Sequence, residues 1–93
     1  MTLTRALNLV RRSCGKDSDH YRRLDLIANA PPDRDSPSSF YDCLGIVRAA
    51  QHDFLSGLLF DMRALVAAEI LGDFIEQAQT LLDAGYYVPA ASL

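Results

Sequence analysis

The stretch RAAQH at residues 48–52 contains the two residues whose types and spacing come nearest to a catalytic pair. Arg48 and His52 are four residues apart, so a helix would place a guanidinium and an imidazole one turn apart on one face. An imidazole can act as a general base and a guanidinium can stabilise a phosphate, so together they could act on an RNA backbone. The pair is a candidate RNA site, but its spacing meets no catalytic motif, so no catalytic residue is assigned.

Arg63 is a second residue of interest, because it lies at the edge of the apolar arc of a long predicted helix. None of its neighbours three or four residues away is an acid, and a buried guanidinium needs a carboxylate or carbonyl partner. We expect a structural ion pair with an acid of a neighbouring helix, Asp53 or Asp42. The alternative is a ligand-binding role for Arg63.

Three acidic residues, Glu69, Asp73 and Glu76, fall on one helical face. A metal would need more ligands than these, and neither histidine lies in this helix, so a solvated acidic stripe is predicted. The sequence also contains no Gly-rich phosphate loop, nucleophile elbow, CxxC or HExxH motif. No metal and no cofactor are predicted, and the main hypothesis is a non-catalytic protein.

The composition is typical of one small folded domain. The chain has 93 residues, 49% of them apolar and 23% charged, which is too hydrophobic for intrinsic disorder. Cys14 and Cys43 have no metal-ligand spacing and follow no secretory signal, so we expect free thiols in a reducing cytoplasm. No apolar run approaches the length needed to span a membrane. A cytoplasmic protein that does not enter a membrane is therefore expected.

Charge is distributed unevenly along the chain. Residues 1–34 contain seven Lys or Arg and four Asp, a balance of +3, whereas residues 35–93 contain two basic and eight acidic residues, a balance of −6. The basic segment is predicted to lie against the acidic face of the same chain. The alternative is that it binds an acidic partner or nucleic acid. The basic residues that would do so are Arg11, Arg12, Lys16, Arg22 and Arg23.

Hydrophobic periodicity predicts an all-α fold. Two short N-terminal helices, at about 3–13 and 19–29, should pack on an antiparallel helical hairpin, at about 37–55 and 58–84. The boundaries depend on local signals: Gly15 as a stop, Ser18 as a cap, Pro37 in a first turn and Gly85 as a final stop. Paired prolines predict a flexible loop at 30–36.

The longest predicted helix, 58–84, has a broad apolar arc that includes Ala67, Ile70, Leu71 and Phe74. Its N-terminal half carries further apolar residues on the side that is otherwise polar, so we expect that half to be covered on more than one side. The cover would come either from the first two helices or from another chain.

An interaction surface is predicted from these extra apolar residues together with the uncharged segment that follows Asp83. A second copy of the chain or a partner helix would cover it. The residues of this predicted surface are Leu58, Met62, Leu65, Tyr86, Tyr87 and Leu93.

Residues 60–93 carry a pattern that is similar to a family of uncharacterised bacterial helical proteins, loosely HEPN-like. The matching residues are Arg63, Leu65, Val66, Ala68, Glu69, Asp73, Phe74, Glu76, Ala78, Leu81, Leu82, Gly85, Tyr86, Pro89, Ala90 and Ala91. In that family a further long helix follows. The resemblance therefore implies that 86–93 are a connector and a helix start, and that residues 1–93 form one helical domain, the N-terminal part of a larger helical unit.

HEPN ribonucleases carry an Arg-x4–6-His motif, from which Arg48 and His52 fall short by one residue. The main hypothesis is thus a non-catalytic helical interaction or oligomerisation module, either a homo-oligomer or bound to a partner helix. Part of a HEPN-like ribonuclease, or a toxin-type RNA-binding protein, is the alternative.

Overall fold

The computed structural model describes residues 3–29, 37–57 and 61–84. This part of the chain is all-α, with the helices α1 (Leu3–Cys14), α2 (Asp19–Ala28), α3 (Pro37–Ser56) and α4 (Met62–Asp83). The predicted fold class is confirmed, and α1, α2 and α3 lie within one residue of their predicted bounds. Outside the described residues lie the predicted loop at 30–36, the predicted connector at 86–93, and Leu58, Tyr86, Tyr87 and Leu93.

The turn between α1 and α2 is set by two of the signals read from the sequence. Gly15 has φ +88, a left-handed conformation that favours glycine, and its N–H donates to Arg11 O at 2.9 Å. Ser18 then caps α2, because its Oγ accepts from the N–H of Tyr21 at 3.1 Å. The chain therefore reverses within a few residues, and α2 folds back onto α1.

α4 begins later than predicted. Asp61 has extended backbone angles, φ −139 and ψ −173, and its Oδ1 accepts from the N–H of Ala64 at 3.0 Å. Asp61 is thus the N-cap rather than a helical residue, and the predicted start at residue 58 is wrong. The helix ends at Asp83 with Ala84 as its C-cap, and Gly85 lies outside the described residues.

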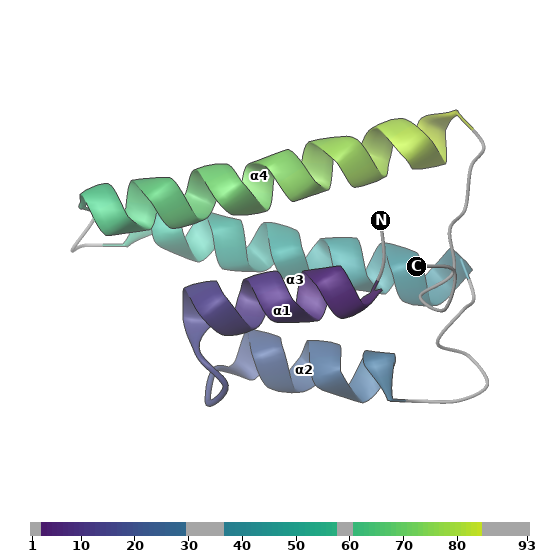
Figure 1. Cartoon of the computed structure of the whole chain (residues 1–93), viewed down its shortest axis with the longest axis horizontal. Helices are drawn as coiled ribbons and strands as arrows, with labels where there is room; N and C mark the ends of the chain where they lie inside the picture. Colours follow the sequence, from purple (N-terminus) through teal and green to yellow (C-terminus); the bar gives the residue numbers. More distant parts are fainter. Residues whose placement is uncertain (1–2, 30–36, 58–60, 85–93) are drawn as a thin grey trace.

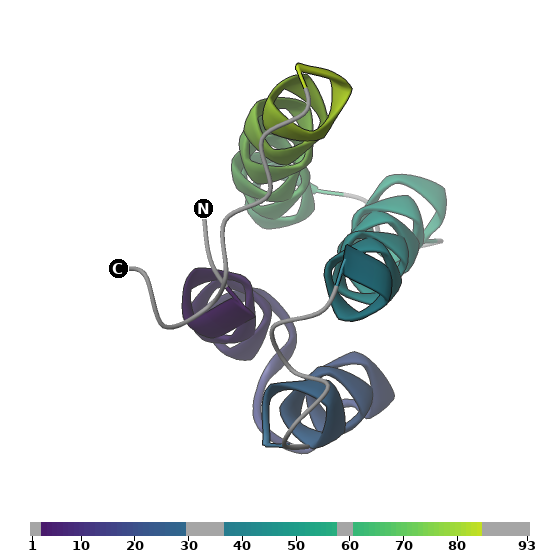
Figure 2. The same ribbon diagram turned by 90° about the vertical axis from the view of Figure 1, so that its right-hand side faces the viewer.

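The four helices form a bundle in which α3 and α4 run side by side and antiparallel (Figure 1). α2 packs on α1 and α3, and α1 also contacts α4. Seen along the helices in Figure 2, α4, α3, α2 and α1 follow one another around a common centre. α4 has its main contacts with α3, so its remaining surface depends on α1 for cover.

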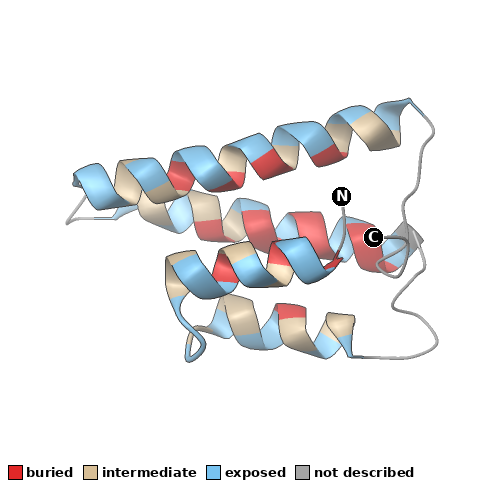
Figure 3. Cartoon of the chain, in the orientation of Figure 1, coloured by how far each residue is buried: buried red, intermediate tan, exposed pale blue. Residues whose placement is uncertain are grey.

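The core occupies the centre of this bundle, and Figure 3 shows the buried residues on the inward faces of the helices. Its largest fully buried side chains are Phe74, Leu3, Leu24, Leu44, Leu71, Val10, Val47 and Cys43. Burial of one such aliphatic or aromatic side chain contributes about 1.5–3 kcal/mol. The buried apolar positions of α1, α2 and α3 recur at helical spacing, and they hold the bundle together.

Two polar contacts link α3 to α4. Gln51 Nε2 donates to Ala68 O at 3.1 Å, and Arg48 Nη2 donates to Gln79 Oε1 at 2.6 Å. A Cβ atom at Gly72 would lie only 2.7 Å from Gln51 Nε2, so glycine gives the Gln51 amide room on the surface of α4. These contacts help to define how α3 and α4 align along their lengths.

Candidate protein-interaction site

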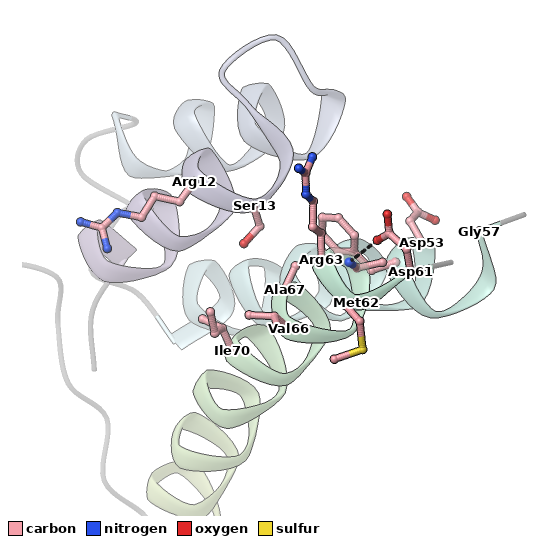
Figure 4. A pocket seen from close by; sticks show the side chains of 12 residues that line it. Arg12, Ser13, Asp53, Gly57, Asp61, Met62, Arg63, Val66, Ala67 and Ile70 are labelled. Carbon is pink, nitrogen blue, oxygen red and sulfur yellow. Dashed lines mark hydrogen bonds between the residues drawn. The ribbon is translucent and has the colours of Figure 1, made fainter. Parts of the chain in front are cut away.

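A groove of about 730 Å³ lies between the C-terminal end of α1 and the N-terminal half of α4 (Figure 4). It exists because α1 ends at Cys14 and the turn at Gly15 sends the chain away from α4. α2 then packs on α1 and α3, so the structure has no third helix over this part of α4 among its described residues. We call this hollow the α1/α4 groove.

The apolar edge of the groove is a stripe on α4 made of Met62, Val66 and Ile70. These side chains are 72%, 50% and 44% exposed, respectively. They are spaced at i, i+4 and i+8, so they lie above one another on a single face of the helix. Single exposed apolar residues are ordinary on protein surfaces, but a continuous stripe beside a groove is typical of an interaction site.

Charged residues from three helices surround the groove. Asp53 Oδ2 lies 2.6 Å from His20 Nε2, which links α3 to α2, and Asp61 is engaged as the cap of α4. Arg12 and Arg63 also line the groove, and both are exposed. Within the described part of the chain, neither guanidinium has a hydrogen-bond or ion-pair partner. The carboxylates of the groove are thus engaged, whereas its two cations are free to meet a ligand.

Neither cysteine is an activated nucleophile. Burial raises the pKa of the Cys43 thiol to about 12. Burial also raises the pKa of Cys14, and the negative charge of Asp53 raises it further. Both raised pKa values favour the protonated thiol near neutral pH, which disfavours a thiolate mechanism at either residue.

The predicted RNA pair lies on α3 rather than in the groove. The guanidinium of Arg48 is bonded to Gln79, and the ring of His52 lies 3.2 Å from Ser56 Oγ through its Nε2 atom. Both residues are exposed. Arg48 therefore has a structural partner on α4, which takes up part of the hydrogen-bonding capacity of its guanidinium.

The predicted ion pair between Arg63 and Asp53 does not form. Both residues line the groove, but Asp53 contacts His20 instead, and no ion pair joins Asp53 to Arg63 in the described ranges. Asp42 is likewise exposed, with no ion pair to Arg63 in the same ranges. The prediction assumed a buried guanidinium, whereas Arg63 is exposed and water can solvate it.

The acidic face of α4 is solvated as predicted, since Glu69, Asp73 and Glu76 are all exposed. In the residues that the structure describes, no group of three or more His, Cys, Asp or Glu side chains could hold a metal ion. A second hollow between α1 and α4 is lined by Arg5 together with Asp73 and Glu76. Basic and acidic segments of the chain are therefore neighbours there, which is the arrangement expected from the charge distribution.

The basic residues considered for an acidic partner or nucleic acid are all exposed, and one of them, Arg12, belongs to the groove. Of the predicted interaction surface, Met62 is exposed in the stripe and Leu65 is half-buried. Val66 and Ile70 complete the stripe, although Ile70 was assigned to the buried arc. The buried arc is instead centred on Ala68, Leu71, Phe74 and Ala78. A closer count of the helical wheel around Val66 could have found the stripe.

Comparison of the chain with protein-family models, with curated proteins and with solved structures gave no significant match. The described helices include none that combines the length and the apolar character required to cross a membrane. The class of site is thus defined by its geometry alone: an amphipathic groove with one apolar edge and two exposed cations.

Proposed function

We propose that this chain is a non-catalytic helical interaction module that binds an amphipathic helix in the α1/α4 groove. The observation that carries the proposal is the stripe of Met62, Val66 and Ile70, which is exposed along one edge of a groove of about 730 Å³. A helix laid in an apolar groove uses anchors at the same i, i+4 spacing, so its side chains can interdigitate with the stripe.

The dimensions of the stripe fit a short helical ligand. From Met62 to Ile70 the helix rises about 12 Å, at 1.5 Å per residue, which matches about two turns of a docked helix. Removing apolar surface from water contributes about 25 cal/mol per Å², so covering the stripe favours association. The protonated thiols also favour a binding function over a thiolate-based catalytic one.

Site-specific photo-crosslinking tests the proposal. A photoreactive amino acid is placed at Val66 in cells that express the chain, and at Arg22 as a control, because Arg22 is exposed on α2 away from the groove. We expect covalent adducts from position 66, either to a second copy or to another protein, that position 22 does not give. Equal adduct patterns from the two positions would contradict an interaction function for the groove.

A further inference from the structure

We propose that the occupant of the α1/α4 groove is an acidic amphipathic helix from another protein. This inference deepens the proposed function, on which it rests, by stating the chemistry of the partner. Its basis is the combination of an apolar stripe with Arg12 and Arg63, whose guanidiniums have no partner among the described residues.

The carboxylates of the groove already have hydrogen-bond partners within the described residues, whereas its guanidiniums have none. Asp53 accepts from His20 at 2.6 Å, and Asp61 accepts from the backbone of Ala64 at 3.0 Å. Asp61 also lies at the N-terminus of α4, where the helix dipole offsets part of its negative charge. Carboxylates on a ligand can therefore bond Arg12 and Arg63 without displacing an existing contact, and guanidinium–carboxylate pairs form strong, directional hydrogen bonds.

A second copy of the chain fits the stripe less well. If two α4 helices pair antiparallel about a two-fold axis through Val66, a residue before Val66 faces the residue equally far after Val66 in the copy, so Arg63 lies at the level of Glu69 and Ile70. If they pair in parallel, Asp73 meets Asp73, because it continues the stripe three residues after Ile70. The parallel arrangement places like charges together, and in the antiparallel one Glu69 lies on the flank of the stripe away from Arg63, so an acidic partner with carboxylates on the groove side is the better match.

The flanks of α4 also orient the partner. Arg63 lies on the side of the stripe that faces the groove and α1, whereas Glu69 is exposed and does not line the groove. A docked helix would place its acidic residues on the side of the stripe nearer α1, where Arg12 of α1 and Arg63 of α4 line the groove, and its apolar face on Met62, Val66 and Ile70.

Three synthetic helical peptides of about 20 residues test this inference by fluorescence anisotropy. The first has leucine along one face and glutamate on the flanks, the second replaces every glutamate with lysine, and the third replaces every leucine with glutamine. We expect the glutamate peptide to bind about tenfold more tightly than the lysine peptide, a preference that weakens with added salt. The glutamine peptide should not bind.

Charge reversal provides the decisive comparison. In the Arg12→Glu, Arg63→Glu double variant, the lysine peptide should bind more tightly than the glutamate peptide. The matched control is Arg22→Glu with Arg23→Glu, which changes the same number of exposed charges on α2 and should leave the original preference intact. Val66→Asp should abolish binding of both peptides, and circular dichroism checks that every variant is folded.

The inference is overturned if the glutamate peptide fails to bind, if the lysine peptide binds as tightly to the native chain, or if charge reversal leaves the preference unchanged. A dimer of the native chain that Val66→Asp dissociates would also overturn it. In that case the crosslinks at position 66 would join two copies, and the proposed function would stand while the acidic partner would not.

Discussion

The contrast between Val66 and Leu71, two apolar residues of the same helix, gives the sharpest test of how α4 is covered. Val66 is 50% exposed in the stripe, whereas Leu71 is 0% exposed in the core. Truncation of each to alanine shortens an apolar side chain at an interior position of α4, and the two truncations differ in helix propensity by only about 0.4 kcal/mol. Their difference in stability therefore reports burial.

The expected changes in the free energy of unfolding follow from the exposed fractions of the two side chains. Val66→Ala removes two carbons at about 0.8 kcal/mol each when fully buried, so half-burial gives a loss of about 0.8 kcal/mol. Alanine regains about 0.6 kcal/mol as the better helix former, and the net change is close to zero. Leu71→Ala leaves a cavity in the core and should lower the free energy of unfolding by about 3 kcal/mol. The total free energy of unfolding of a domain of this size is roughly 5–10 kcal/mol, so the Leu71→Ala variant still folds.

Urea unfolding followed by circular dichroism measures both changes, with the slope of the transition as a check on two-state behaviour. The measurement is repeated at about tenfold lower protein concentration, because an oligomer that covers Val66 would make the cost of its truncation depend on concentration. A loss above about 1.5 kcal/mol for Val66→Ala at the lower concentration would refute the conclusion that the stripe is exposed.

Three further predictions concern residues outside the stripe. Ser18→Ala removes the cap of α2 and should lower the free energy of unfolding by about 1 kcal/mol, measured by urea titration; an unchanged midpoint would contradict the capping bond. Burial raises the pKa of Cys43 in the folded state from 9.0 to about 12. Above pH 9.0 the unfolded chain loses this proton while the folded chain keeps it, so the free energy of unfolding should fall between pH 9.0 and about 12. Cys43→Ala should flatten that decline, and an equally steep decline in the variant would exclude Cys43 as its cause. The purified chain should cleave no RNA, and neither should the His52→Ala variant, whose free energy of unfolding should change by no more than about 0.5 kcal/mol. RNA cleavage by the native chain that is lost in His52→Ala would favour the ribonuclease alternative.

The helices were largely predictable because their signals are local. Gly15 stops α1 and Ser18 caps α2 through bonds to residues no more than four positions away. The start of α4 was missed because Asp61 can be read either as a polar residue within a helix or as its cap, and the apolar residues before it extended the periodic pattern. The choice between these roles depends on the backbone conformation of Asp61, which periodicity does not report.

The candidate site was predictable only in part. Met62 was expected at an interaction surface, and it is exposed in the stripe. Ile70 was expected in the core, and it lies at the edge of the groove, because the side of α4 that α3 and α1 cover is centred on Leu71 and Phe74. The expected pairing of Arg63 with Asp53 failed for a related reason, since His20 of α2 reaches Asp53 instead.

By itself the sequence determined the fold class and three sets of helix bounds. Those features depend on apolar periodicity and on caps, which act over a few residues. The tertiary structure alone decided which side of α4 stays uncovered, which carboxylates are engaged and which cations remain free. These depend on where a helix from a distant part of the chain packs, and the turn at Gly15, which directs α2 toward α3 and leaves α4 open, has this effect only in three dimensions.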